Sequence, residues 1–318
     1  MYAMENKINI EISIVIPAYN EEESLQTLFD ALYPVMKNMN RSFEIVFVND
    51  GSKDRTLDIL CGFCKEYSEV RVIDLNGNFG QHMAIMAGFD NVRGSKIITL
   101  DADLQNPPEE IPKLIAEMDK GHDVVGTYRV GRKDPAFRKI ASKIINKLTN
   151  KIAKLNITDY GCMLRGYDRR IIEIINESKE STTFIPALGQ KFAVNPIEIP
   201  VAHRERGMGT SKYGFFQLIR LNFDLMTSFS LFPLQMVTVV GMTISLLSLI
   251  LVCYLFLRRL IIGPEAEGLF TLMAIQFFLI GLTLFSLGIV GEYMGRIYRE
   301  VSRRPRYAIR KVFEHDEL

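Results

Sequence analysis

Two long apolar segments constrain the possible folds of this chain more than any other feature of its sequence. Residues 236–257 and 269–290 are each 22 residues long and carry no charged side chain. A helix of about 20 apolar residues is long enough to cross the hydrocarbon core of a bilayer. The two segments therefore predict a pair of transmembrane helices, and the alternative is a helical hairpin buried inside a soluble domain.

The charges around these segments predict their orientation. Residues 258–268 form a short connection, so the regions before and after the pair are expected on the same side of the membrane. Seven Lys or Arg residues lie between Arg296 and Lys311, and positively charged flanks favour the cytoplasm. Arg258 and Arg259 in the connection argue mildly for the opposite orientation. We expect both termini in the cytosol.

A repeating strand-and-helix pattern precedes the apolar segments. Short runs rich in β-branched and apolar residues recur over residues 11–128, with helical periodicity between them. This alternation predicts an α/β domain with a mostly parallel, Rossmann-like sheet that helices cover on both faces. The predicted strands cover residues 12–16, 43–48, 70–75, 96–100 and 123–128.

Two polar side chains are expected to begin the first helices of this pattern. Asn20 can cap a helix together with Glu23, three residues later, as in a capping box. Asp54 can cap the next helix, which is expected to run to Tyr67.

An acidic segment at residues 101–105, with the sequence DADLQ, directly follows the strand predicted at 96–100. In open α/β sheets, ligands bind at the carboxyl ends of the strands. The carboxylates of Asp101 and Asp103 suit a hard divalent cation that also binds substrate phosphates. The alternative is an acidic turn that leads into a proline-started helix.

A basic amphipathic segment follows the α/β region. Residues 129–155 contain nine Lys or Arg residues and a single acid, with apolar residues at helical spacing. This pattern is typical of a helix that binds a membrane surface or an anion, and the alternative is a solvated surface helix. Residues 213–232 are aromatic and amphipathic, and they predict an interfacial helix directly before the first apolar segment.

Three motifs at strand ends resemble those of the inverting family 2 glycosyltransferases of GT-A fold. They are Pro17-Ala18-Tyr19-Asn20-Glu21, Asn49-Asp50-Gly51-Ser52 and Asp101-Ala102-Asp103, in this order along the chain. The resemblance implies a GT-A catalytic domain that binds a UDP-sugar together with Mg²⁺ or Mn²⁺. It implies uridine contacts from Pro17, Tyr19, Glu21 and Asp50, donor contacts from Asp101, Ala102 and Asp103, and metal ligation by Asp103 and Gln105, with Asp101 either on the metal or on the ribose.

The membrane segments and the basic segment indicate an acceptor that resides in the membrane. A polyprenyl phosphate fits, because its tail can stay in the lipid while its phosphate reaches the cytosolic face. That phosphate is already ionised near neutral pH, so it needs cations to offset its charge more than it needs a general base. The candidates are Arg129, Arg138, Arg204 and Arg206. Asp159 matches the acceptor-side acid of the family, and the alternative is a capping or turn role.

Longer stretches resemble one subgroup of this family, the undecaprenyl-phosphate 4-deoxy-4-formamido-L-arabinose transferases. These stretches are residues 78–88, 100–112, 159–167, 183–186 and 291–298. The resemblance implies a multi-pass enzyme of the bacterial inner membrane that acts in lipid A modification and forms a homo-oligomer, a tetramer in the family. Residues 189–191 and 207–209 depart from the expected pattern, so UDP-glucose, a UDP-N-acetylhexosamine or a mannose donor stays an alternative.

Other classes of protein fit the sequence less well. A net charge of +1 gives no reason to expect nucleic-acid binding. A processive polysaccharide synthase requires a Gln-x-x-Arg-Trp segment, and the chain contains no Trp. A non-catalytic membrane scaffold would not need the DADLQ segment. The expected organisation is a catalytic domain at 1–210, an interfacial helix at 211–232, transmembrane helices within 233–290 and a cytosolic basic tail at 291–318.

Overall fold

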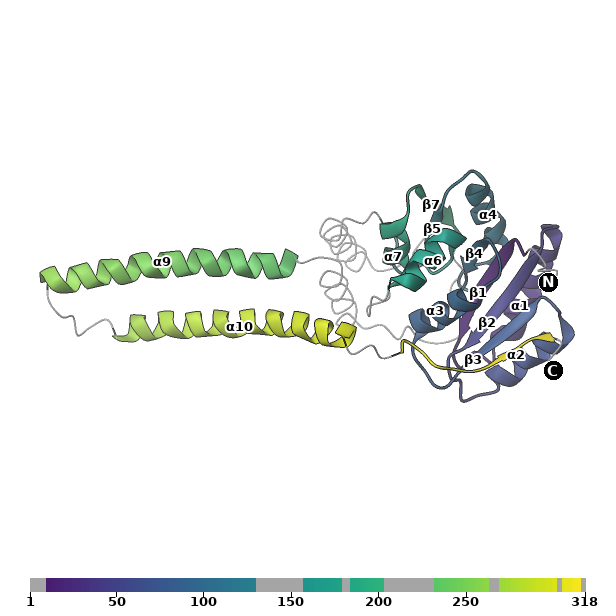
Figure 1. The fold of residues 1–318 in the computed structure, drawn as a ribbon, viewed down its shortest axis with the longest axis horizontal. Coiled ribbons are helices and arrows are strands. Elements are labelled where there is room, and N and C mark those ends of the chain that lie inside the picture. Colours follow the sequence, from purple (N-terminus) through teal and green to yellow (C-terminus); the bar gives the residue numbers. More distant parts are fainter. Residues whose placement is uncertain are drawn as a thin grey trace, which may run out of the picture. The chain divides into compact units, whose positions relative to one another are not determined.

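The chain forms two compact units in the computed structural model (Figure 1). One unit contains residues 1–214 together with residues 304–318, and the other contains residues 215–303. The residues that the structure describes are 10–129, 157–178, 184–202, 232–262, 269–301 and 305–315. The basic segment at 129–155 and the interfacial helix predicted at 211–232 lie almost entirely outside these ranges.

An eight-stranded sheet forms the centre of the first unit, with the strand order β7-β5-β6-β4-β1-β2-β3-β8. Six strands run parallel to one another, and β6 and β8 run antiparallel to their neighbours. The mostly parallel sheet predicted from the sequence is confirmed. The strands are β1 Ile12–Ala18, β2 Phe43–Asn49, β3 Val70–Leu75, β4 Lys96–Thr99, β5 Val124–Arg129, β6 Arg165–Asp168, β7 Pro196–Val201 and β8 Ile309–Phe313.

Most of the helices that pack on this sheet bury one apolar stripe, whereas α3 buries six consecutive residues, 84–89. Helix α1, for example, buries Leu25, Leu28, Phe29, Leu32 and Met36, which recur at the spacing of one helical face. The strands of the centre are buried along their whole length, as expected of a sheet covered on both faces. The helices are α1 Leu25–Asn38, α2 Thr56–Glu66, α3 Gln81–Asn91, α4 Ile111–Asp119, α6 Arg169–Glu177 and α7 Ile185–Phe192, and a 3₁₀ turn η1 covers Pro108–Glu110.

The capping box predicted at Asn20 is wrong. Helix α1 begins after Ser24, and Asn20 adopts a positive φ of 53° in the preceding loop. Its side-chain oxygen instead accepts the backbone N–H of Lys53 at 2.9 Å, so Asn20 joins two loops. Asp54 does act near a helix start, because its carboxylate accepts the backbone N–H of Thr56 at 3.0 Å.

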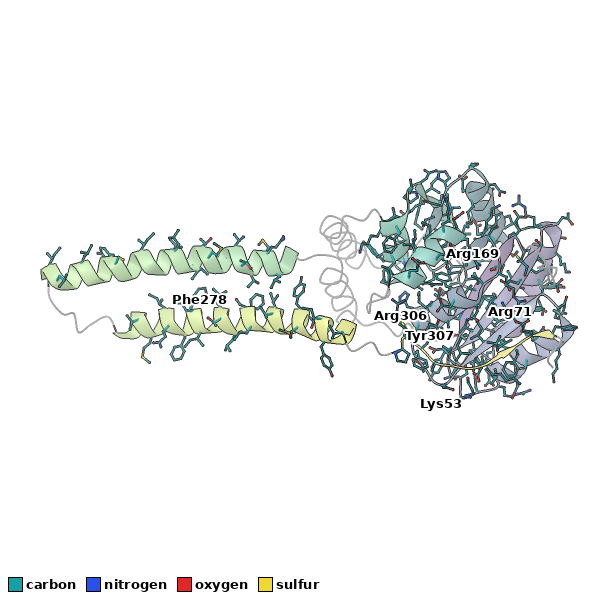
Figure 2. The ribbon with its side chains drawn as sticks, viewed as in Figure 1. Lys53, Arg71, Arg169, Phe278, Arg306 and Tyr307 are labelled. Atoms are coloured by element: carbon teal, nitrogen blue, oxygen red, sulfur yellow. The ribbon has the colours of Figure 1, made fainter. Side chains whose placement is uncertain are left out.

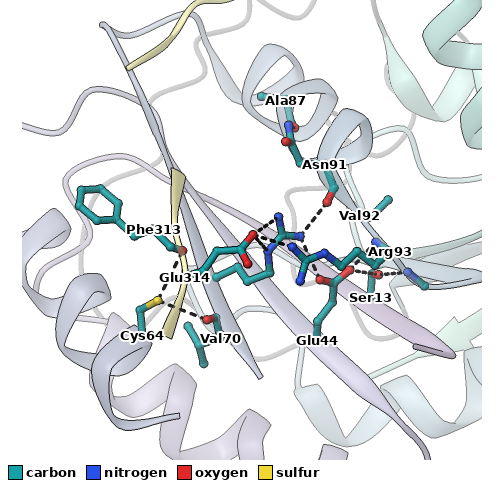
Figure 3. Close-up of polar contacts among 12 residues, drawn as sticks. Ser13, Glu44, Cys64, Val70, Ala87, Asn91, Val92, Arg93, Phe313 and Glu314 are labelled. Carbon is teal, nitrogen blue, oxygen red and sulfur yellow. Dashed lines mark hydrogen bonds and ion pairs between the residues drawn. The ribbon is translucent and has the colours of Figure 1, made fainter. Parts of the chain in front are cut away.

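The strand β8 was not predicted, because its residues were assigned to a basic tail. It pairs antiparallel with β3 and covers that edge of the sheet, with Val72 opposite Phe313. Beyond it, Glu314 accepts from Arg71 at 2.9 Å and from Arg93 at 2.6 Å, and Arg71 also pairs with the buried Glu44 (Figure 3). The residues after the second long helix therefore belong to the same sheet as the N-terminal strands.

The second unit contains two long helices, α9 Phe232–Ile262 and α10 Leu269–Val301. Figure 2 shows apolar side chains along both, and Phe278 is one of many that are exposed. Within the described residues, one segment is long and apolar enough to cross a membrane: Ile275–Gly295 of α10, with 21 residues and a mean hydropathy of 1.8. Helix α9 holds a shorter apolar segment, Leu234–Ile244, so the pair of membrane spans stays a prediction.

Candidate functional site

The carboxyl ends of four parallel strands bring the predicted motifs to one edge of the sheet. Strands β1, β2, β3 and β4 run in the same direction, and a polar loop follows each of them. The antiparallel β6 begins at this same edge, so the loop that precedes it also reaches the site. The topology therefore gathers five loops where open α/β sheets bind their ligands.

Asp101 lies at the centre of the acidic part of this site. Its Oδ1 accepts a hydrogen bond from Gln81 Nε2 at 2.6 Å, which ties the acidic loop to the first residue of α3. Burial raises the pKa of Asp101 to about 7, and the nearby negative charges of Asp103 and Glu21 act in the same direction. Arg129 opposes them and lowers this pKa. Several carboxylates thus lie close to one another here.

Asp103 closes a tight turn in the same loop. Its Oδ1 accepts the backbone N–H of Gln105 at 3.1 Å, and Leu104 between them has a positive φ of 60°. Ala102 is buried, with 4% of its surface exposed, so its side chain packs beneath the loop. The turn holds the two carboxylates of the motif in one place.

The acidic loop fits a divalent cation that shares its coordination with substrate. No group of three or more His, Cys, Asp or Glu side chains has the arrangement of a complete metal site in the described part of the chain. Mg²⁺ ordinarily uses one or two carboxylates and completes its shell with waters and phosphate oxygens. Burial is the main cause of the raised pKa of Asp101, and the repulsion from Asp103 and Glu21 that adds to it is the kind of charge accumulation that a bound cation relieves.

The first two loops are joined to each other by hydrogen bonds. Asn20 N–H donates to Ser52 Oγ at 3.1 Å, and Glu21 N–H donates to Thr56 Oγ1 at 2.9 Å. The Glu21 carboxylate accepts from Ser24 at 2.8 Å. Pro17 is buried within β1, whereas Tyr19 is 38% exposed at the loop. Tyr19 therefore remains accessible to a ligand, and Pro17 shapes the strand end.

Asp50 holds the loop that follows β3. Its two carboxylate oxygens accept the backbone N–H groups of Phe79 at 2.7 Å and Gly80 at 2.9 Å. Burial raises the pKa of Asp50, although these two hydrogen bonds act against the shift. Gly51 beside it has φ +68°, and a Cβ there would lie 2.5 Å from the Gly77 backbone. Glycine is required at this close approach.

Arg129 and Asp159 form a two-pronged ion pair on the other side of the site. Arg129 Nε donates to Oδ2 of Asp159 at 2.6 Å, and Nη2 donates to Oδ1 at 2.8 Å. Both side chains are largely buried, with 14% and 7% of their surfaces exposed. Such a bidentate pair fixes the orientation of both groups. The sequence named each residue separately, and the structure places the two side chains in direct contact.

Arg165 supports this pair from beneath, and its role was not predicted from the sequence. Its side chain is fully buried at the start of β6. Nη2 donates to the backbone oxygen of Asp159 at 2.8 Å, and Nε donates to that of Cys162 at 2.9 Å. Arg165 therefore holds the turn that carries Asp159. A charged residue within a short buried strand was the available sequence signal.

An aromatic cluster lies beside the acidic loop. His82, which follows Gln81 on α3, packs its ring edge against Phe184, with ring centres 5.0 Å apart, and Phe184 also contacts Tyr160. Burial lowers the pKa of His82 to about 4, so its ring is neutral near pH 7. The remaining predicted arginines, Arg138, Arg204 and Arg206, lie outside the described residues.

Known proteins of one enzyme family are similar to this chain in sequence. The sequence model described as "Glycosyl transferase family 2" matches residues 13–175. The chain is 48% identical over 305 residues to an undecaprenyl-phosphate 4-deoxy-4-formamido-L-arabinose transferase of Photorhabdus laumondii, covering 95% of this chain and 94% of the relative. It is 48% identical to the protein of the same name in Proteus mirabilis, covering 96% of this chain and 94% of that protein.

Among solved structures, a similar fold occurs in a glucosyl-3-phosphoglycerate synthase from Mycobacterium tuberculosis, determined in complex with Mn²⁺, UDP and phosphoglyceric acid. The TM-score is 0.49 at 15% sequence identity, and the match covers 69% of this chain and 77% of that one.

Proposed function

The chain belongs to glycosyl transferase family 2, and on this premise we propose that it transfers a 4-deoxy-4-formamido-L-arabinose residue from its UDP derivative to undecaprenyl phosphate. The observation that carries the proposal is the identity of 48% over 95% of the chain to a protein named for that reaction. The site agrees with it, because an acidic loop and an arginine-carboxylate pair meet at one edge of the sheet.

The proposed reaction is a displacement at the anomeric carbon of the donor. A phosphate oxygen of the lipid attacks this carbon, the bond from the carbon to the UDP oxygen breaks, and UDP leaves with the electron pair. The attacking oxygen is already ionised near neutral pH, so the step needs positioning and charge stabilisation more than proton removal. In this reading Asp159 orients Arg129 rather than taking a proton.

The donor is assigned to the loops after β1, β2 and β4. Tyr19, which is exposed, and Glu21 are assigned to the uridine, together with the loop that Asp50 holds. Asp101, Asp103 and Gln105 would hold Mg²⁺ or Mn²⁺, and the bound cation would offset the charge of the departing diphosphate as a Lewis acid. Arg129 supplies a fixed positive charge on the opposite side of this acidic loop.

The membrane topology follows from the position of β8 if α10 crosses the bilayer. The chain before α9 leads back to β7, and the chain after α10 enters β8, and both strands belong to one sheet. A sheet cannot be divided by a membrane, so the number of crossings between β7 and β8 must be even. Helix α9, with 31 residues and a length of about 45 Å, is the partner we assign to α10.

This topology gives the proposed location of the catalytic domain and of its lipid acceptor. The catalytic domain faces the cytosol of a bacterial inner membrane, where the UDP-sugar is available, and the acceptor enters from the lipid. Arg138, Arg204 and Arg206 stay candidates for binding its phosphate, and a homo-oligomer stays a prediction from the family resemblance.

The test is a panel of UDP-sugars offered to the purified protein with undecaprenyl phosphate in detergent micelles, followed by mass spectrometry of the lipid product. We expect the formamido-arabinose lipid to form fastest, with weak transfer of hexoses. A hexose differs from this pentose by its C6 hydroxymethyl group, and a pocket discriminates against a group of that size by about 10- to 200-fold. The control is Asp103→Asn, which should form none of these lipid products at a comparable rate. Faster transfer of glucose or an N-acetylhexosamine would replace the proposed donor and leave the acceptor assignment in place.

A further inference from the structure

The segment after the second long helix contacts the loop that follows β3. Asn76 N–H donates to the backbone oxygen of Ala308 at 2.9 Å, and Arg310 Nη2 donates to the backbone oxygen of Asn76 at 3.3 Å. Both backbone groups of Asn76 are therefore held by residues from the C-terminal end of the chain. Farther along α3, Tyr307 hydrogen-bonds to Asp90.

Arg310 also reaches a buried carboxylate that leads to the next loop. Its Nη1 lies 3.3 Å from Oδ2 of Asp74, which is 2% exposed. Oδ1 of Asp74 accepts from Asn49 Nδ2 at 2.7 Å, and Oδ1 of Asn49 accepts the backbone N–H of Ser52 at 3.2 Å. Three contacts thus connect Arg310 to the loop that carries Asp50.

The same two loops border the acidic part of the site. Residues 76–80 lie between Arg310 on one side and the Asp50 carboxylate on the other. The next residue, Gln81, donates to Asp101 at 2.6 Å. A shift of this loop would therefore move groups on both the uridine side and the metal side of the site.

We infer that Arg310 is a positioning residue of the donor site, which acts by fixing the loops after β2 and β3 and thereby favours binding of a nucleoside diphosphate. The inference rests on the proposed UDP-sugar donor, and it assigns to the C-terminal strand a part in binding the donor. Arg310 acts through Asp74 and Asn76.

The energetics favour positioning over simple stabilisation. The Arg310 side chain is 58% exposed, and ion pairs of this exposure add little to stability. A second anchor of the same strand gives the comparison. Glu314 binds Arg71 and Arg93 near the amino-terminal end of β3, away from the loops of the site (Figure 3).

The experiment compares the two anchors in the full-length protein. Arg310→Met, Arg310→Lys and Glu314→Gln are purified in detergent, and UDP binding is measured by calorimetry in the presence of Mg²⁺ together with the melting temperature. We expect Arg310→Met to weaken UDP binding by about fivefold, the upper end of what an ion pair of this exposure can contribute. Arg310→Lys should recover part of the loss, and Glu314→Gln should lower the melting temperature while leaving UDP affinity within about twofold.

Activity measurements add a second readout. The KM for the UDP-sugar should rise in Arg310→Met more than the KM for undecaprenyl phosphate. Asp74→Asn should weaken UDP binding in the same direction, and the double variant should show less than the sum of the two effects, because both act through one contact.

Three results would overturn the inference. They are an unchanged UDP affinity in Arg310→Met, an equal loss of affinity in Glu314→Gln, and a wild-type protein that binds no UDP. A wild-type protein that binds UDP but transfers no formamido-arabinose would defeat the proposed sugar and acceptor reaction, while the comparison of UDP affinities would still decide the role of Arg310.

Discussion

Arg129 and Asp159 lie 30 residues apart in the chain and are joined by two hydrogen bonds of 2.6 and 2.8 Å. Asp159→Asn should lower kcat by about 100-fold or more, because it leaves the largely buried Arg129 without its fixed orientation. Arg129→Lys keeps the positive charge but cannot make the two parallel hydrogen bonds of the guanidinium, so a smaller loss of kcat is expected. Steady-state kinetics with undecaprenyl phosphate measures both. Equal rates in wild type and Asp159→Asn would remove the pair from the reaction.

The acidic loop predicts a strict requirement for a divalent cation. Asp103→Asn should reduce turnover by about 1,000-fold or more while the protein stays folded, since a bound cation supplies several kcal/mol of charge stabilisation. The matched control is Asp30→Asn, which changes an exposed carboxylate on α1. Activity is measured before and after dialysis against EDTA, with Mg²⁺ or Mn²⁺ added back. Full activity of the dialysed protein would contradict the prediction.

The raised pKa of Asp101 predicts a pH dependence of metal binding. With a pKa of about 7, this carboxyl holds a proton below neutrality, and that proton competes with the cation. The apparent affinity for Mg²⁺ should therefore fall as the pH drops from 8 to 6. The stability of the metal-free protein should change with pH in the opposite direction to the metal affinity. The raised pKa of Asp101 favours the folded state at low pH, and this contribution is lost as the pH rises toward 7. Metal titrations at several pH values measure the affinity, and a flat profile would argue against the assignment.

His82 predicts a separate effect of acid on stability. Burial lowers its pKa to about 4, whereas the pKa of a histidine in an unfolded chain is about 6.5. The unfolded chain therefore binds the proton more readily, and stability should decline as the pH falls from about 6.5 to about 4. His82→Phe should flatten this decline. Melting temperatures of both proteins across that range provide the measurement, and parallel curves would show that His82 does not cause it.

The position of β8 predicts the accessibility of the connection between the two long helices. A cysteine at position 265 should react with an impermeant thiol reagent in intact cells, whereas one at the exposed Lys120 of the catalytic domain should react only after lysis. Wild-type protein gives the background from the four native cysteines. The reverse labelling would place the catalytic domain away from its nucleotide-sugar supply.

The central sheet could be predicted from local sequence patterns because its strands are short, apolar and directly followed by polar loops. The acidic loop was found for the same reason. The contacts of the site could not be predicted in this way, since they join residues that are distant in sequence. Asn20 illustrates the difference: its local pattern favoured a helix cap, but the nearby Lys53 N–H competes successfully for the same side-chain oxygen.

Strands that depend on distant partners were also missed. Residues 309–313 contain two basic residues and resemble a solvated tail, and their partner β3 lies more than 230 residues earlier in the chain. An edge strand needs fewer apolar residues than a central one, so its local signal is weak. The role of Arg165 was missed for a different reason, because its partners are nearby backbone oxygens, which no side-chain pattern reveals.

The late position of β8 in the sequence sets an order for biogenesis. Domains generally begin to fold from the N-terminal side during synthesis, but this sheet can be completed only after α9 and α10 have been made. Until then the edge of β3 is uncovered, and the buried Arg71 lacks Glu314. A chain that stops after α10 would keep an open sheet edge, which favours aggregation. Closure of this edge therefore distinguishes a finished chain from an interrupted one.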